Sequence, residues 1–244
     1  MRLITVLLLV ACGQGKSEAV SGSGDTGGTS LTGTSVTGTS TTDSGDPTGA
    51  GGWSHTATVD GDVSEYSADE TWATTGGSVH ITWDATTLYV ASSHPDAETG
   101  GELHWLMVYV GDGSTGTTEG ATMNSQQPTL PVPMSHVARR KADGSYDDLL
   151  AWSGTEWAST AGWLSGGPGQ VAEAGQAVEL AIPLADIATE QLVVHVAWLY
   201  EGTGYESTYS GAPAASFVDG YDPDYSAVFT FDLLSADAPA VQQP

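Results

Sequence analysis

All eight tryptophans and all nine tyrosines of this chain lie after residue 52, and this division constrains its fold more than any other feature. A folded core needs large apolar side chains, because their burial offsets the conformational entropy that folding removes. Only the chain from Trp53 onward can supply such a core, and its length suits one two-sheet domain. We therefore predict one folded domain over residues 53–235, followed by a flexible tail over residues 236–244.

The first residues have the pattern of an export signal. Arg2 precedes an apolar run, Leu3–Ala11, which is too short to span a bilayer as a permanent helix and is followed by Cys12. The sequence Leu-Val-Ala-Cys that ends at Cys12 resembles the signal of bacterial lipoproteins, which implies cleavage before the cysteine and its acylation. We expect a signal peptide over residues 1–11 and a protein lipid-anchored at the bacterial outer membrane or cell surface. The alternative is an ordinary signal peptide.

Residues 12–52, from the lipidated cysteine onward, have the composition of a disordered tether. Positions 13–52 contain 12 Gly, 9 Thr and 7 Ser, and Thr-Gly-Thr-Ser recurs at 32–35 and 37–40. Such a segment has too little apolar surface to become ordered, and a Gly/Ser-type coil of this length spans roughly 35 Å. We expect it to hold the domain off the membrane without fixing its orientation, with O-glycosylation of its threonines as an open further role.

Charge and cysteine content exclude several classes of function. The chain has 5 Lys plus Arg against 30 Asp plus Glu, a formal net charge of −25. It could not neutralise a phosphate backbone, so we expect no nucleic-acid partner. A single cysteine excludes a disulfide framework and every cysteine-cluster metal site. We expect contact with the membrane through the lipid anchor only.

Strand patterns recur along the domain. Apolar and polar residues alternate at Val79–Trp83 and Val178–Ile182, and longer apolar runs cover Leu103–Val110 and Leu192–Tyr200. A run that is apolar on both faces is typical of a central strand. The only helical signal is one turn at Pro183–Ile187. The pattern predicts an all-β fold, a two-sheet antiparallel β-sandwich of jelly-roll-like type.

One hairpin is predicted at residue level. Asp143-Gly144 is typical of a two-residue turn, and pairing outward from it places Arg139 opposite Asp148 and Arg140 opposite Asp147. Cations that face carboxylates across strands favour ion pairs, worth at most about 1 kcal/mol each, over an anion-binding site.

Three motifs resemble a known superfamily. Val59–Asp62, with the sequence Val-Asp-Gly-Asp and followed by Glu65-Tyr66, is similar to the opening of family 9 carbohydrate-binding modules. Val79–Val90, which contains Trp83-Asp84 and Leu88-Tyr89-Val90, is similar to their second signature, which is shared with the DOMON superfamily. Asp219–Tyr225 resembles the closing segment of secreted bacterial relatives. The resemblance implies a β-sandwich from a superfamily of sugar binders, haem binders and domains without a known ligand. Tyr66 stands where the modules often carry Trp.

Aromatic rings give the first candidate site. Sugar C–H faces stack on Trp and Tyr rings, while polar neighbours bind the hydroxyls. Trp152, Trp157 and Trp163 lie in a turn-rich stretch without a clean strand period, so we expect some of them to form an exposed carbohydrate-binding platform, Trp157 first. Burial of all three is the alternative. The tryptophans inside predicted strands are expected in the core: Trp83, Trp105 and Trp198.

Aspartates give the second candidate site. Asp219, Asp222 and Asp224 lie within six residues, and Ca²⁺ favours several oxygen ligands on a sharply turned loop. We predict a calcium site at this loop. A second cluster is the next candidate: Asp60, Asp62 and Glu65. The alternative is that all these carboxylates cap loop amides.

Neither haem nor catalysis is favoured. The six histidines show no short ligand spacing and the chain has no c-type attachment motif, so we expect no haem, although DOMON-type domains can bind it. No serine nucleophile motif is present, and we expect no enzyme. The sequence predicts non-catalytic binding of a polysaccharide or glycan. The open alternatives are a structural or adhesion lipoprotein that binds a surface partner protein, and a haem-binding electron carrier.

Overall fold

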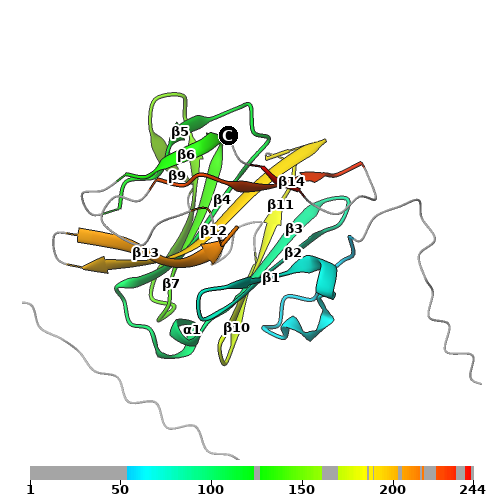
Figure 1. Cartoon of the computed structure of the whole chain (residues 1–244), viewed down its shortest axis with the longest axis vertical. Coiled ribbons are helices and arrows are strands. Elements are labelled where there is room, and N and C mark those ends of the chain that lie inside the picture. The colour runs from blue at the N-terminus through cyan, green and yellow to red at the C-terminus, as the bar shows by residue number, and fades with distance from the viewer. Residues whose placement is uncertain are drawn as a thin grey trace, which may run out of the picture. The chain divides into compact units, whose positions relative to one another are not determined.

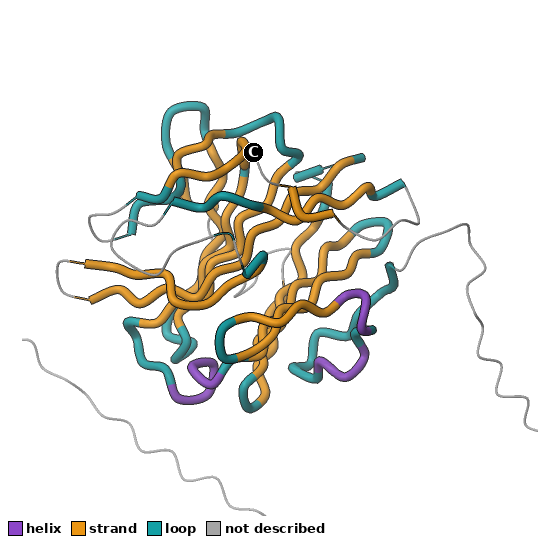
Figure 2. Tube along the Cα trace, viewed as in Figure 1, coloured by secondary structure: helices purple, strands orange, loops and turns teal. Residues whose placement is uncertain are grey.

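The computed structural model describes residues 54–123, 127–160, 170–185, 187–188, 190–202, 205–214, 216, 224–234 and 240–242. Within them, strands predominate and helices are single short turns (Figure 2). All strand pairs are antiparallel, and the predicted all-β sandwich is confirmed. Several predicted features lie outside the described residues: the signal peptide, Cys12, the whole tether, Trp163, Asp219 and Asp222.

The sandwich consists of a small and a large sheet. In Figure 1, cyan β1–β3 and yellow β11 belong to the small sheet, and green β4 and β7 belong to the large one. The small sheet runs in the order β1 (Thr71–Thr74), β2 (Gly77–Trp83), β3 (Thr87–Ser93), β11 (Ala177–Pro183), β10 (Gln170–Ala174). The large sheet runs in the order β15 (Ala240–Gln242), β14 (Val228–Asp232), β12 (Gln191–Gly202), β4 (His104–Gly111), β7 (His136–Lys141), β8 (Asp147–Trp152), β9 (Trp157–Thr160). Outside this order, β13 (Tyr205–Ala212) pairs with β12, and β5 (Thr117–Glu119) pairs with β6 (Thr129–Met134).

The main core lies between the two sheets, where every second residue of each strand points inward. It includes alternate residues of β2 (Val79, Ile81, Trp83), β11 (Val178, Leu180, Ile182), β4 (Leu106, Val108, Val110) and β14 (Phe229, Phe231). The prediction that Trp83, Trp105 and Trp198 are buried is confirmed.

A second core covers the outer face of the large sheet. Strand β4 alternates between the two cores, since Leu106 and Val108 face the main core while Met107 and Tyr109 face the second. Leu130 and Met134 of β6 pack on this outer face. The prediction of a central strand that is apolar on both faces is thus confirmed for Trp105–Val110, whereas Leu103 precedes β4 and is exposed.

The β7–β8 hairpin has the predicted register but a different turn. Arg139 pairs with Asp148 and Arg140 with Asp147, as expected. The closing loop has four residues, because the Lys141 amide donates to the carbonyl of Tyr146, and the Gly144 amide donates back to Lys141. A two-residue turn would pair Ala142 with Ser145. Instead, the Ala142 amide donates to His104 at the start of β4, which holds the hairpin to its neighbour.

The predicted single turn at Pro183–Ile187 is present but begins one residue later. Pro183 is the last residue of β11 and pairs with Thr87, and the Leu184 amide still donates to the carbonyl of Thr86. One hydrogen-bonded turn follows, in which the amides of Ile187 and Ala188 both donate to the carbonyl of Leu184. The described residues contain one α-helix, α1 (Pro95–Thr99), and two 3₁₀ turns, η1 (Val63–Glu65) and η2 (Ala68–Glu70). Helix α1 is too short for a periodic signal, although Pro95 opens it.

Two of the three motifs that resemble the superfamily lie within the described residues, and both hold the scaffold together. The amides of Asp60 and Gly61 donate to the buried Glu179 carboxylate on β11, which clamps the N-terminal segment onto the small sheet. The Asp84 carboxylate accepts the amide of Thr86 and the hydroxyl of Tyr89, which forms the β2–β3 turn. The side chain of Asp84 and the backbone of Asp60 and Gly61 thus serve the fold.

We predict that Gly61→Ala destabilises the domain more than Gly154→Ala does. Both glycines have positive φ, 87° and 98°, where any L side chain costs about 1–2 kcal/mol. A Cβ at Gly61 would also lie 2.6 Å from the Ala174 amide nitrogen, whereas one at Gly154 meets nothing within 4 Å. The clash adds about 1–3 kcal/mol. Denaturant unfolding of both variants measures the difference in their free energies of unfolding. Equal losses of stability would show that the backbone around Gly61 can shift to make room for the added Cβ.

Candidate functional site

Two of the three predicted platform tryptophans lie side by side. Trp152 ends β8, Trp157 begins β9, and the two residues are paired in the ladder. Their ring centroids are 5.7 Å apart and the rings meet at 66°. Ser153 closes the intervening turn, because its hydroxyl accepts the amide of Glu156. The prediction that the stretch is rich in turns is confirmed, but these two tryptophans belong to strands, because the turn is tight enough to pair them.

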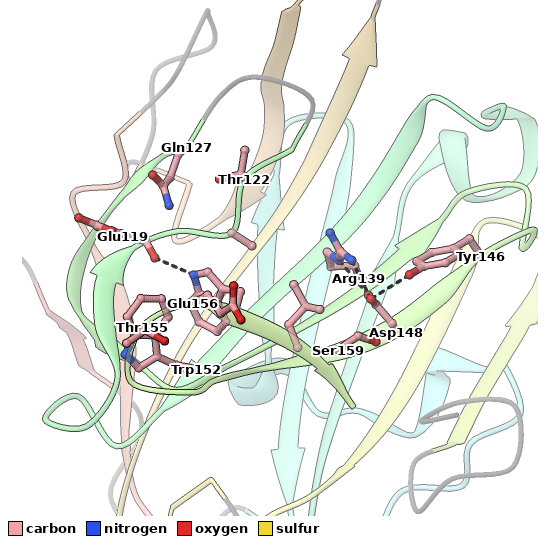
Figure 3. Close-up of a pocket in the computed structure, with 13 residues that line it drawn as sticks. Glu119, Thr122, Gln127, Arg139, Tyr146, Asp148, Trp152, Thr155, Glu156 and Ser159 are labelled. Carbon is pink, nitrogen blue, oxygen red and sulfur yellow. Dashed lines mark hydrogen bonds and ion pairs between the residues drawn. The ribbon is translucent and has the colours of Figure 1, made fainter. Parts of the chain in front are cut away.

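These rings line a cleft of about 440 Å³ on the outer face of the large sheet (Figure 3). Six of the lining residues occupy alternate positions along β7, β8 and β9 and therefore point to the same face: Arg139, Asp148, Leu150, Trp152, Trp157 and Ser159. The remaining lining residues come from turns and from the segment around β5: Glu119, Ala121, Thr122, Gln127, Tyr146, Thr155 and Glu156.

Trp157 is anchored, whereas Trp152 is held by fewer contacts. The Trp157 indole Nε1 donates to the carbonyl of Glu119 at 2.9 Å, and its ring packs against the second core. Both tryptophans are half-buried. Trp157 therefore forms part of the wall of the cleft. The expectation that Trp157 leads the platform is revised in favour of Trp152.

The other end of the cleft holds a buried ion pair. Arg139 donates through Nε and Nη2 to the two oxygens of Asp148, at 2.8 and 2.7 Å, and the Tyr146 hydroxyl donates to Asp148 at 3.0 Å. Burial lowers the pKa of Arg139, but the bond to Asp148 outweighs it and the pKa is raised overall. The guanidinium is therefore a fixed cation, and the predicted cross-strand ion pairing is confirmed.

A row of ring contacts, two edge-to-face and one stacked, connects Trp157 in the wall of the cleft to His195. Trp157 meets Tyr109 at 6.3 Å, Tyr109 meets Tyr225 at 6.1 Å, and Tyr225 stacks on His195 at 4.0 Å. His195 is completely buried, and its Nε2 lies 2.6 Å from the hydroxyl of Ser216. Burial lowers its pKa to about 3. The imidazole is thus neutral in the folded protein.

The structure describes only one residue of the predicted calcium loop. Asp224 accepts the amide of Thr129 at 3.0 Å, and calcium at this loop stays a prediction. The carboxylates of the second cluster cap backbone amides, as the alternative expected: Asp60 accepts the amide of Asp62, Asp62 that of Ser64, and Glu65 that of Thr58. Among the described residues, no three His, Asp or Glu side chains are placed to hold a metal ion.

Sequence reasoning missed most of the polar lining of the cleft. Tyr146, Gln127 and Ser159 carry no motif, and Glu119 comes from a hairpin outside the two main sheets. The sequence did contain a signal for the part of the lining that lies on β7 and β8. The predicted β7–β8 register, carried outward, places Asp148 and Trp152 on one face with Arg139.

Comparison of the sequence with protein-family models and with curated proteins found no match. In the described part of the chain, no helix has the length and hydropathy needed to cross a membrane.

We predict that the protein loses stability as the pH falls from about 6.5 towards 3. The unfolded chain takes up a proton on His195 near its ordinary pKa of about 6.5, whereas the folded protein does not until about pH 3. Each such proton costs about 1.4 kcal/mol per pH unit. Burial also lowers the pKa of His80 and His94, which act in the same direction.

Denaturant unfolding at several pH values measures this slope. His195→Gln should flatten it, and His136→Gln, at a half-buried histidine at the start of β7, is the matched control that should keep it. A wild-type slope in the His195 variant would contradict the assignment.

Proposed function

We propose that this protein is an exported lipoprotein whose β-sandwich binds a polysaccharide or glycan without catalysing a reaction. One observation carries the proposal: strand pairing brings Trp152 and Trp157 together in a cleft otherwise lined mainly by polar side chains. Apolar ring faces next to hydrogen-bonding groups are what sugar rings need. The superfamily that the chain resembles includes sugar binders, so its scaffold is compatible with this class of ligand.

The chemistry of the cleft favours binding over catalysis. Its buried carboxylate, Asp148, already accepts hydrogen bonds from Arg139 and Tyr146. It is therefore not free to act as a general acid or base. Ser159, which also lines the cleft, has no histidine beside it among the lining residues. A binding role requires only the rings and the polar rim.

We predict that Trp152→Ala abolishes most glycan binding with a small change in melting temperature. Trp157→Ala should lose both binding and about 2–3 kcal/mol of stability, because its half-buried ring packs against the second core. Binding is measured on a glycan array and with insoluble polysaccharides, and oligosaccharide should quench tryptophan fluorescence.

Trp72→Ala is the matched control, because Trp72 packs on Phe229 at the far side of the main core. It should cost stability and leave binding intact in the protein that remains folded. If the wild type binds no glycan on a broad array, the proposal fails and the partner-protein alternative takes its place.

We also propose that Cys12 carries the lipid anchor. Three acyl chains exceed the two-signal requirement for stable attachment. Cys12→Ser should therefore release the protein from the membrane fraction or block its processing, as detergent partitioning measures. A serine variant that partitions like the wild type would contradict lipidation at this residue.

A further inference from the structure

The charge of the cation in the cleft is already compensated by Asp148. All three guanidinium nitrogens of Arg139 have partners: Nε and Nη2 donate to Asp148, and Nη1 lies 3.4 Å from the sulfur of Met123. An acidic sugar would have to compete for the charge of Arg139 with Asp148, which is buried and holds the guanidinium at two points. Breaking such a buried pair is costly, because one charge would be left uncompensated.

The other described cations are also engaged elsewhere. Arg140 points away from the cleft and forms ion pairs with Glu173 at 2.6 Å and Asp147 at 3.5 Å. The Lys141 ammonium lies 5.2 Å from the centre of the Trp105 ring. No lining residue other than Arg139 is a cation.

At the tryptophan end the charge is negative and uncompensated. Figure 3 shows Glu156 at the same end of the cleft as Trp152 and Thr155, with Glu119 on the rim, while Arg139 and Asp148 lie at the other end. Glu156 is exposed in the turn that follows Trp152, and none of the described salt bridges involves it. The chain's net charge of −25 adds to this field.

We propose that the cleft selects glycans that carry protonated amines, such as glucosamine oligomers, over neutral and acidic ones. This inference rests on the proposed glycan-binding function. An ammonium on a sugar stacked on Trp152 would lie close to the Glu156 carboxylate and would also be attracted by the tryptophan ring face. A uronate would meet the carboxylate of Glu156 and find no free cation.

The test measures how tightly the wild-type protein binds three oligosaccharides of equal length at mildly acidic pH. They are a fully deacetylated glucosamine oligomer, its N-acetylated counterpart and an oligogalacturonate, titrated by tryptophan fluorescence. The deacetylated oligomer should bind about two- to fivefold more tightly than the acetylated one, as expected of an exposed ion pair. Higher ionic strength should shrink this ratio.

Glu156→Gln should shrink the ratio, because it should weaken binding of the deacetylated oligomer more than binding of the acetylated one. Glu98→Gln, which removes one exposed negative charge on α1, is the matched control and should keep it. Equal binding of the two oligomers by the wild type, or tighter binding of oligogalacturonate, overturns the selectivity and leaves glycan binding standing. Binding of none of the three, together with an empty glycan array, overturns the proposed function as well.

Discussion

The large sheet is apolar on both faces at its centre, and the rest of the structure follows from that constraint. Residues of β4 and β12 alternate between the two cores, so neither face can be left in water. The small sheet covers one face. The other is covered by β6 and by Met123 and Tyr225. This cover ends over β7–β9, where charged and aromatic side chains replace aliphatic ones, and the cleft opens at that boundary.

Many carboxylates of this protein accept hydrogen bonds from backbone amides, because the chain has too few cations to pair with them. Glu179 accepts two amides from the N-terminal segment, and Asp112 accepts those of Ser114 and Thr115. Burial is the largest single influence on the pKa of Asp112 and raises it, but the hydrogen bonds from Ser114 and Thr115 together outweigh it and lower the pKa to about 2. Acidic residues of this kind fix turns and clamps. Consequently, a cluster of aspartates in this chain is weak support for a metal site, as Asp60 and Asp62 show.

Local patterns predicted the fold better than the site. Alternation identified the main strands, and one turn gave the register of β7 and β8, because strand period and turn chemistry are encoded in neighbouring residues. The cleft depends on contacts between distant segments. Trp157 bonds to Glu119, 38 positions away, and no local pattern reveals that distance. Helix α1 was missed for the opposite reason, since its five residues are too few to show a period.

The motifs that resemble carbohydrate-binding modules and the residues that line the cleft do different work. Asp84 and the Asp60-Gly61 backbone form hydrogen bonds that fix the β2–β3 turn and the clamp on β11, so their presence favours a scaffold and leaves the ligand open. The ligand must instead be inferred from β7–β9 and the turn at Glu156, which belong to no motif. Arg139 is held by Asp148 within this surface, so the charge of the cation in the cleft is compensated. If the cleft binds a glycan, a paired cation at one end and an exposed carboxylate beside a tryptophan at the other would distinguish ligands by charge as well as by shape.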